Sequence, residues 1–295
     1  MGTAKRAVIG VVGGSGLYAM DGIANAAWRK VDSPFGEPSD ELLFGTIDDV
    51  EVRFLPRHGR GHRLSPSTIN YRANIDALKR AGCTDILSMS AVGSLREDLA
   101  PGTFVVVDQF VDRTFAREKS FFGDGCVGHV SVAKPVCGRV GDALAKTAAT
   151  QQISYVRGGT YLVMEGPQFS SEAESHLYRS WGMSVIGMTN MPEAKLAREA
   201  EICYASVAMV TDYDCWRTGH DHVTVDDVVR VLHANAGNAR ALIRAVVPDL
   251  ADRPECCDRG CDRALEYAIM TSPEARSQEV LARLSAVAGR VLSKG

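Results

Sequence analysis

The chain lacks the long apolar run, the strong net charge and the dense cysteine pattern that mark several classes of protein. Its 295 residues contain no apolar stretch near the ~20 residues that a membrane span needs, and residues 1–6 are too short and polar for a signal peptide. A formal net charge of −3 with mixed signs leaves no electrostatic footprint for nucleic acid or an anionic membrane. We therefore expect a cytoplasmic protein that binds neither nucleic acid nor membrane.

The eight cysteines are too sparse for a disulfide-framed secreted domain of this size, so we expect most of them to be reduced and half-buried. Cys256, Cys257 and Cys261 lie close enough in sequence to bind a metal or form a redox bridge. They lack the CxxC pair and the nearby histidine that are typical of zinc sites. The sequence therefore predicts no metal, and it leaves open whether these three, or Cys137 with Cys203, form a bridge.

The chain also lacks a Pro/Ser-rich linker, an internal repeat and a low-complexity tract, which favours one large domain. Apolar runs predict buried strands over 7–12, 50–55, 85–89, 103–107, 159–164, 185–188 and 203–210. Apolar residues at three- and four-residue spacing predict helices over 70–81, 139–150, 171–181, 193–200 and 225–246. This alternation indicates an α/β sandwich with a mixed, largely parallel central sheet flanked by helices.

Three phosphate-compatible segments follow predicted strands. Ser15 lies in the glycine turn GGSG, where free backbone N–H groups and a hydroxyl can hold a phosphate oxygen. Arg57 and His58 open the cationic segment RHGRGH, and Ser90 precedes Ala91 in SAVGSL. Taken singly, the glycine turn is as consistent with a plain tight turn, and the serine is more often a cap or turn residue. The cationic segment could be a solvated loop, but its position after an apolar strand fits an anion pocket better. Together, after three strands of one sheet, they favour an anion site.

Two further segments suit a planar base. Phe169, in EGPQFSS, can stack on a base, although ordinary core packing is the alternative for a single aromatic residue. Asp212 and Asp214 flank Tyr213, and in an extended chain both carboxylates lie on one face, where each raises the pKa of the other. A protonated carboxyl there can donate to a departing heterocycle, whereas an exposed loop with two turn-forming aspartates is the plain alternative.

Taken in order, these segments resemble a known family. The chain contains GGSGLY, SPFGEPSD, PRHGRGHRLSPSTINYRANIDALK, SAVGSLRED, DQFVDRT, EGPQFSSEAES, GMTNMPEAKLAREAEICYAS and TDYDCW. This series is similar to the methylthioadenosine phosphorylases, in the trimeric purine nucleoside phosphorylase superfamily. The resemblance implies a nucleoside phosphorylase catalytic domain over 1–250. Residues 251–295 then form a C-terminal cysteine-bearing helical extension, packed on the same domain, whose sequence looks like the ends of some microbial members.

The resemblance also implies roles for individual residues. It assigns phosphate binding to Ser15, Arg57, His58, Ser90, Ala91 and Thr189. It places Met188 beneath the ribose, Phe169 against the base, and Asp212 and Asp214 as catalytic, purine-binding carboxylates. It assigns substrate choice to Ser170 and Val225, and the lining of a 5'-alkylthio pocket to Val228 and Val229. His129 matches a histidine that a neighbouring subunit contributes, which implies a homotrimer or a hexamer of two trimers.

Departures from the family pattern are few. Ser15 and Ser90 stand where members often have threonine, and both keep the hydroxyl. Asn190 stands where many members have Thr, Ser or Gly, so its role stays open.

The implied activity is phosphorolysis of S-methyl-5'-thioadenosine to adenine and 5-methylthioribose 1-phosphate, in purine and methionine salvage. Phosphate is the co-substrate and no cofactor is expected; 5'-deoxyadenosine and adenosine are candidate secondary substrates. Asp212 favours adenine because a carboxyl group can accept from its 6-amino group and, when protonated, donate to N7.

Three other functions would fit parts of this pattern. A purine nucleoside or methylthioinosine phosphorylase would act on 6-oxopurines, for which asparagine would suit the position of Asp212 better. A regulatory protein that kept the fold and lost catalysis would bind ligand without turnover. A dinucleotide-dependent oxidoreductase would need the GxGxxG spacing, which the first glycine turn lacks.

Overall fold

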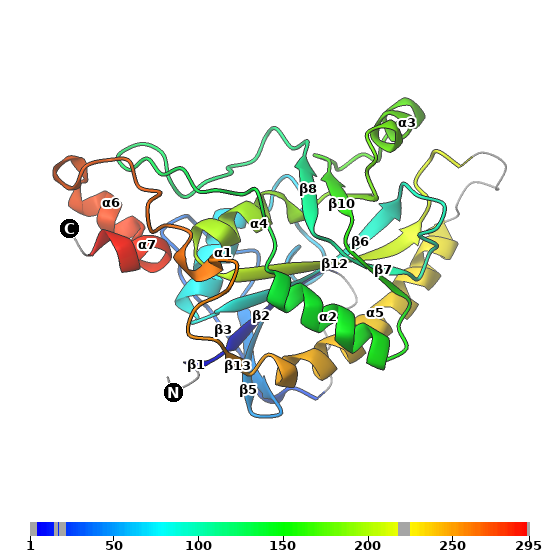
Figure 1. Cartoon of the computed structure of the whole chain (residues 1–295), viewed down its shortest axis with the longest axis horizontal. Helices are drawn as coiled ribbons and strands as arrows, with labels where there is room; N and C mark the ends of the chain where they lie inside the picture. Colours follow the sequence, from blue (N-terminus) through cyan, green and yellow to red (C-terminus); the bar gives the residue numbers. More distant parts are fainter. Residues whose placement is uncertain (1–4, 15–16, 18–21, 218–224, 294–295) are drawn as a thin grey trace.

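A mixed sheet with helices on both faces forms the body of the protein (Figure 1). The computed structural model describes residues 5–14, 17, 22–217 and 225–293, with the backbone alone for Lys5 and residues 225–229. Within these residues eleven strands form one sheet, and a separate antiparallel pair consists of β1 (Lys5–Arg6) and β13 (Asp252–Arg253). No helix in this part of the chain is both long and apolar enough to cross a membrane.

One path through the large sheet runs in the order β3 (Ala24–Arg29), β4 (Leu42–Ile47), β5 (Val50–Pro56), β2 (Val8–Gly13), β6 (Asp85–Ser94), β11 (Val185–Gly187), β10 (Thr160–Val163) and β8 (Gln109–Asp112). Off this path, β6 also pairs with β12 (Cys203–Asp212), which pairs with β7 (Phe104–Val106), which pairs with β9 (Tyr155–Arg157). Parallel pairs outnumber antiparallel ones. The predicted mixed, largely parallel sheet is therefore confirmed.

Two apolar cores cover the faces of the sheet. Successive residues of β6 alternate between them, so that Ile86 belongs to one core and Leu87 to the other. The first core contains residues of α1 (Tyr71–Arg80), α4 (Asn190–Glu199) and α7 (Ser285–Leu292). The second contains residues of α2 (Gly138–Thr150) and α5 (Val225–Asp249), which Figure 1 shows side by side below the sheet. This is the predicted α/β sandwich.

Local sequence explains where the helices begin. The Asn70 side chain accepts a hydrogen bond of 3.1 Å from the backbone N–H of Ala73 and so caps α1. Ser171 and Glu174 form a reciprocal capping box at the start of α3 (Glu172–Ser180).

All the predicted strands and helices are present, and β6 differs most in length. The sequence predicted that this strand ends at residue 89, before Ser90 and Ala91. β6 continues to Ser94, so both residues lie inside the strand. The chain after β13 contains two 3-10 turns (Cys261–Arg263 and Pro273–Ala275) and α6 (Gln278–Arg283) before α7. Its apolar side chains are shared between the two cores, with Cys257 and Cys261 in the second and Leu284 in the first.

Candidate active site

A cavity of about 540 Å³ opens where β6 changes partners. β2 pairs with β6 as far as Ser88, and β11 pairs with it only from Gly93 onward. Residues 89–92 therefore have no strand partner on that edge in the described part of the chain, while β12 continues on the other edge. The cavity fills this gap, and residues 89–93 of β6 all line it. A change of strand partner inside one sheet thus creates the space for a ligand.

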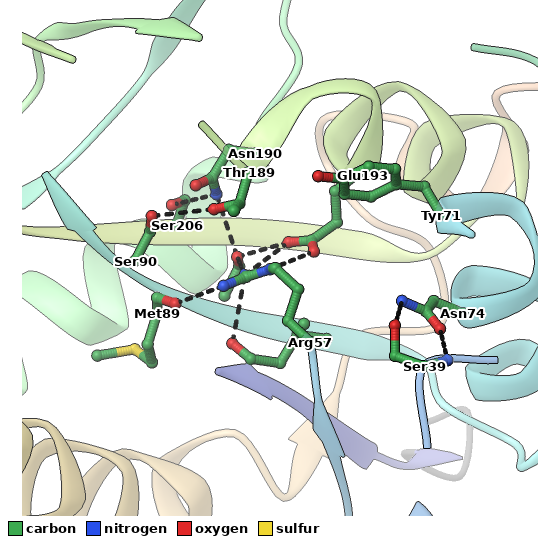
Figure 2. Close-up of polar contacts among 12 residues, drawn as sticks. Ser39, Arg57, Tyr71, Asn74, Met89, Ser90, Thr189, Asn190, Glu193 and Ser206 are labelled. Carbon is green, nitrogen blue, oxygen red and sulfur yellow. Dashed lines mark hydrogen bonds and ion pairs between the residues drawn. The ribbon is translucent and has the colours of Figure 1, made fainter. Parts of the chain in front are cut away.

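One end of the cavity is built on a buried ion pair. The Arg57 guanidinium donates through Nε to Glu193 Oε2 at 2.8 Å and through Nη2 to Glu193 Oε1 at 3.0 Å, with only 1% and 3% of the two side chains exposed. It also donates to the Met89 carbonyl (Figure 2) and to the Ser88 hydroxyl. Burial alone would lower the pKa of Arg57, but the Glu193 carboxylate raises it, so the cation is permanent. Its Nη1 keeps one N–H beyond the bond to Met89, and Arg57 lines the cavity.

Two hydroxyl groups meet beside this cation. Ser90 Oγ lies 3.1 Å from Thr189 Oγ1 and 3.0 Å from the Tyr161 hydroxyl, which brings together strands β6 and β10 and the start of α4. Thr189 occupies the N-cap position of α4 but makes no capping bond, because its hydroxyl faces Ser90. Ser90, Ala91 and Thr189 all line the cavity, as the predicted phosphate site requires.

Asn190 has a clear structural place beside Thr189 (Figure 2). Its Nδ2 lies 2.6 Å from the Tyr204 hydroxyl, 2.7 Å from Ser206 Oγ and 3.1 Å from Ser88 Oγ, and the residue is fully buried. Ser88 in turn contacts both Arg57 and Glu193. Asn190 therefore supports the ion pair through Ser88 and Tyr204, which both contact Glu193, and it does not line the cavity.

His58 lines the cavity in a neutral form. Burial lowers its pKa to about 4. Its Nδ1 lies 2.9 Å from the Leu64 carbonyl, which can only accept, so Nδ1 carries the proton and Nε2 is left as an acceptor. Its ring stacks on His62 with centroids 4.3 Å apart. A phosphate that keeps one O–H could donate it to Nε2.

The two carboxylates stand at the other end of the cavity. The register of β12 against β6 shifts between Val210 and Asp212, so a bulge sets the direction of Asp212. Asp212 accepts from Thr211 Oγ1 at 2.7 Å and from the backbone N–H of Asp214 at 2.8 Å. Gly93 lies opposite, where a Cβ atom would stand 3.1 Å from Asp212 Oδ1.

Asp214 does not continue the strand. Its φ of 54° turns the chain, which corrects the expectation of an extended Asp-Tyr-Asp segment with both side chains on one strand face. Burial raises the pKa of Asp214, a hydrogen bond of 2.5 Å from Ser175 Oγ opposes this, and the charge of Asp212 raises it further. The raised pKa that the sequence predicted for this pair is therefore found at Asp214.

A second buried arginine holds the loops that carry the nucleoside-binding residues. Arg117 donates to the carbonyls of Met188 at 2.6 Å, Met191 at 2.7 Å and Glu165 at 2.6 Å. Burial would raise the pKa of Glu165, but hydrogen bonds from Ser67 and from two backbone N–H groups, with the charge of Arg117, lower it to about 2. This arrangement ties Met188 to the segment that leads to Phe169.

The remaining predicted residues fall into three groups. Phe169 lines the cavity with 84% of its surface exposed, so the alternative of ordinary core packing is wrong. Ser170, which contacts Met164 Sδ at 3.6 Å, and the exposed His129 are not among the lining residues. Outside the described residues or side chains lie Ser15, Val225, Val228 and Val229.

Sequence reasoning missed the two residues that organise the site, Glu193 and Arg117. A signal existed for Glu193, because it is an acid inside the otherwise buried start of α4, and a buried acid needs a cationic partner. No local signal marks Arg117, whose partners lie 46 to 74 residues away.

Comparison with known proteins identifies the family of the chain that carries this site. Residues 8–248 match the model of the phosphorylase superfamily. S-methyl-5'-thioadenosine phosphorylases of Rhodospirillum rubrum and Cereibacter sphaeroides are 62% and 60% identical to this chain, over 98% and 97% of it and 98% and 99% of their own lengths.

Solved structures agree with this result. A methylthioadenosine phosphorylase from an antarctic soil metagenomic library superposes with a TM-score of 0.90 at 47% identity, covering 96% of this chain and 99% of that one. A mutant adenosine/methylthioadenosine phosphorylase of Schistosoma mansoni in complex with methylthioadenosine gives 0.79 at 38% identity, covering 83% and 92%. The chain is therefore an enzyme of the phosphorylase superfamily and belongs to its methylthioadenosine phosphorylase family.

Proposed function

We propose that this chain transfers the pentosyl group of S-methyl-5'-thioadenosine to inorganic phosphate, releasing adenine and 5-methylthioribose 1-phosphate, in purine and methionine salvage. One observation carries the proposal. A single cavity has a permanent buried cation and paired hydroxyls at one end and two carboxylates, one with a raised pKa, at the other. The phosphate anion suits the cationic end, and the amino group and N7 of a purine suit the carboxyl end. The two ligands lie on opposite sides of the bond that breaks.

Phosphate is the nucleophile in this proposal. Arg57 Nη1, Ser90, Thr189 and the backbone of the unpaired edge of β6 orient it, while His58 Nε2 accepts its remaining O–H. A phosphate oxygen forms the new bond to C1' as the bond from C1' to N9 breaks. The sugar passes through an oxocarbenium-like state, which the phosphate charge stabilises from below. No further cofactor enters this scheme.

The departing base takes the electron pair of the broken bond and needs a proton at N7. We assign proton delivery to the pair Asp212 and Asp214, which share the proton that passes to N7, and burial raises the pKa of Asp214. Asp212 accepts a hydrogen bond from the 6-amino group, which a 6-oxopurine cannot donate. Phe169, at the mouth of the cavity, then closes over the face of the base.

The methylthio group is the finer part of the proposal. Leu232 and Ala236 of α5 line the cavity, and Val228 and Val229 precede them on the same helix. An apolar wall leaves the 5'-hydroxyl of adenosine without partners, yet such walls discriminate by only about 1–3 kcal/mol per group. Adenosine and 5'-deoxyadenosine are therefore proposed as slower substrates.

We further propose that three copies, or two such trimers, form the working enzyme, with His129 reaching a neighbouring site. His129 is exposed and lies outside the cavity of its own chain, which leaves its imidazole available to another copy. Light scattering on the purified protein measures the assembly, and a monomer with full activity would contradict it.

The test of the function follows free adenine from methylthioadenosine with and without phosphate. We expect adenine only when phosphate is present, together with one equivalent of pentose 1-phosphate. Release of adenine without phosphate would indicate a hydrolase and overturn the proposal, and turnover of methylthioinosine to hypoxanthine at an equal rate would overturn the adenine preference. Specificity constants for methylthioadenosine, 5'-deoxyadenosine and adenosine test the preference for the 5'-methylthio group. Equal values would contradict this preference and leave the phosphorolysis of adenine nucleosides in place.

A further inference from the structure

Four cysteines meet inside the protein, away from the cavity. The Sγ atoms of Cys137, Cys203, Cys257 and Cys261 all lie within 4.8 Å of one another. All four residues are buried, and none forms a disulfide. They come from three separate parts of the chain, because Cys137 is the N-cap residue of α2, Cys203 is the first residue of β12, and the other two follow β13.

The backbone around these sulfurs is fixed by hydrogen bonds. The N–H of Cys137 donates to the Tyr204 carbonyl at 2.7 Å, which ties the start of α2 to the start of β12. The N–H of Gly260 donates to the Cys257 carbonyl at 2.9 Å, and its φ of 62° closes a tight turn between Cys257 and Cys261. Both carboxylate oxygens of Asp262 accept from the N–H of Cys257, at 3.2 and 3.1 Å. The four thiols therefore converge on one point from a pre-arranged scaffold.

The spacing of the sulfurs fits a tetrahedral metal site better than a bridge. A tetrahedral ion bound at about 2.3 Å by four thiolates holds its sulfurs about 3.8 Å apart. Cys137 Sγ and Cys257 Sγ are already 3.7 Å apart. The other Sγ–Sγ distances are at most 4.8 Å, so each would have to shorten by about 1 Å or less when the ion binds. A disulfide needs about 2.05 Å, and four mutually adjacent sulfurs offer no preferred pairing.

Two arginines, Arg139 and Arg253, lie beside one sulfur of such a centre, and both also pair with Asp85. Four thiolates around a divalent ion carry two net negative charges. Arg253 Nη2 lies 3.8 Å from Cys203 Sγ, and Arg139, paired with Asp85, is within hydrogen-bonding reach of the same sulfur. The Nε atoms of Arg139 and Arg253 are both buried without a hydrogen-bond partner in the described structure. Donors beside a thiolate site orient and stabilise its sulfurs.

We propose that Cys137, Cys203, Cys257 and Cys261 bind one Zn²⁺ ion in a closed, structural site. Four soft thiolate ligands in tetrahedral reach select zinc among the common divalent ions and leave no position open for substrate. Binding replaces four S–H bonds with four Zn–S bonds and releases the protons to solvent, without oxidation or reduction. The ion clamps the segment after β13 to the sheet and to α2.

This proposal departs from the expectation drawn from sequence spacing. Cys256 is exposed and accepts from Arg263 Nη2 at 2.6 Å, so it does not belong to the group. The missing ligands are Cys137 and Cys203, 120 and 54 residues upstream of Cys257. A ligand set divided in this way has no CxxC signature, and only the fold brings it together.

The first test uses the unaltered protein, purified under reducing conditions without chelator. Elemental analysis should find one zinc per chain, and exchange with Co²⁺ should give the visible bands and sulfur-to-cobalt charge-transfer absorption of a tetrahedral thiolate site. Reduced protein that takes up neither ion overturns the proposal. So does an intact mass that shows these four cysteines joined as two disulfides.

A matched pair of variants locates the ion. Cys261→Ser should lose the metal and the Co²⁺ spectrum, whereas Cys256→Ser, five residues away and exposed, should keep both. Retention of a full equivalent by Cys261→Ser, or loss by Cys256→Ser, contradicts the assignment. Near-ultraviolet circular dichroism reports whether each variant is folded. If Cys261→Ser does not fold, the charge-transfer intensity of the Co²⁺-loaded parent protein still decides whether four thiolates bind the ion, and the Cys256→Ser variant still tests whether Cys256 is one of them.

Discussion

The two ends of the cavity are built in different ways. At the phosphate end, Arg57 and Glu193 are almost completely buried, and their hydrogen bonds join β6 and the start of α4. At the base end, Asp212 and Asp214 are half-buried on a turn, and Phe169 is exposed. A small anion of constant shape suits a fixed set of donors, whereas a base that must enter and leave suits an open rim. Substitutions should therefore damage folding at one end and turnover or affinity at the other.

The largest effect is expected from Asp212→Asn. The amide keeps the size of the side chain, but it cannot carry a proton to N7, and its NH₂ group confronts the 6-amino group of adenine. Loss of proton transfer lowers turnover by roughly 10²–10⁴-fold, with residual activity shifted toward 6-oxopurines. Steady-state kcat on methylthioadenosine and methylthioinosine measures both changes. Asp98→Asn, in an exposed pair with Arg96, serves as the control, and unchanged kcat in Asp212→Asn would remove this residue from catalysis.

At the other end, Glu193→Gln should act first on stability. The substitution leaves the Arg57 cation buried without its counter-ion, which costs about 3–5 kcal/mol in the free energy of unfolding. The matched control is Glu41→Gln, which breaks the exposed contact with Arg60 and should cost at most about 1 kcal/mol. Urea unfolding at one protein concentration compares them. Equal losses in the free energy of unfolding would show that the buried ion pair stabilises the protein no more than the exposed one.

The sequence predicted the residues of the base end, but it did not predict the buried ion pair that supports the phosphate end. Phe169, Asp212 and Asp214 lie in short segments whose residue types suggest their chemistry. The role of Glu193 is to pair with Arg57, which is 136 residues away in the sequence. A pairing over this distance leaves no periodic pattern in the sequence.

The same distinction holds for the fold. The predicted strands are apolar runs buried on both faces, which sequence shows directly. β3 was missed because its residues Ala24–Arg29 are mostly exposed at the edge of the sheet and carry no apolar alternation. β8 was missed because four residues at the other edge give too short a pattern.

A smaller effect is expected from Phe169→Ala. Loss of stacking on the base should weaken nucleoside binding by about 1–3 kcal/mol and raise KM for methylthioadenosine, with KM for phosphate unchanged. Phe115→Ala is the control, because Phe115 is exposed to a similar degree, at 82% against 84%, but does not line the cavity. Separate titrations of the two substrates measure the difference. An equal rise in both KM values would show that the two ends are not independent.

The finest distinction concerns the pKa of Asp214 within the pair that shares the proton. Ser175→Ala removes a hydrogen bond that lowers the pKa of Asp214, so this pKa rises further. An acid with a higher pKa stays protonated to higher pH, and the alkaline limb of the kcat profile should therefore move upward. Ser180→Ala, on the same helix but with a hydroxyl that donates to the Leu177 carbonyl and not to Asp214, should leave the profile in place. An unmoved limb in Ser175→Ala would assign the proton to Asp212 alone, and the base end would then depend on one carboxyl group where the phosphate end depends on a network.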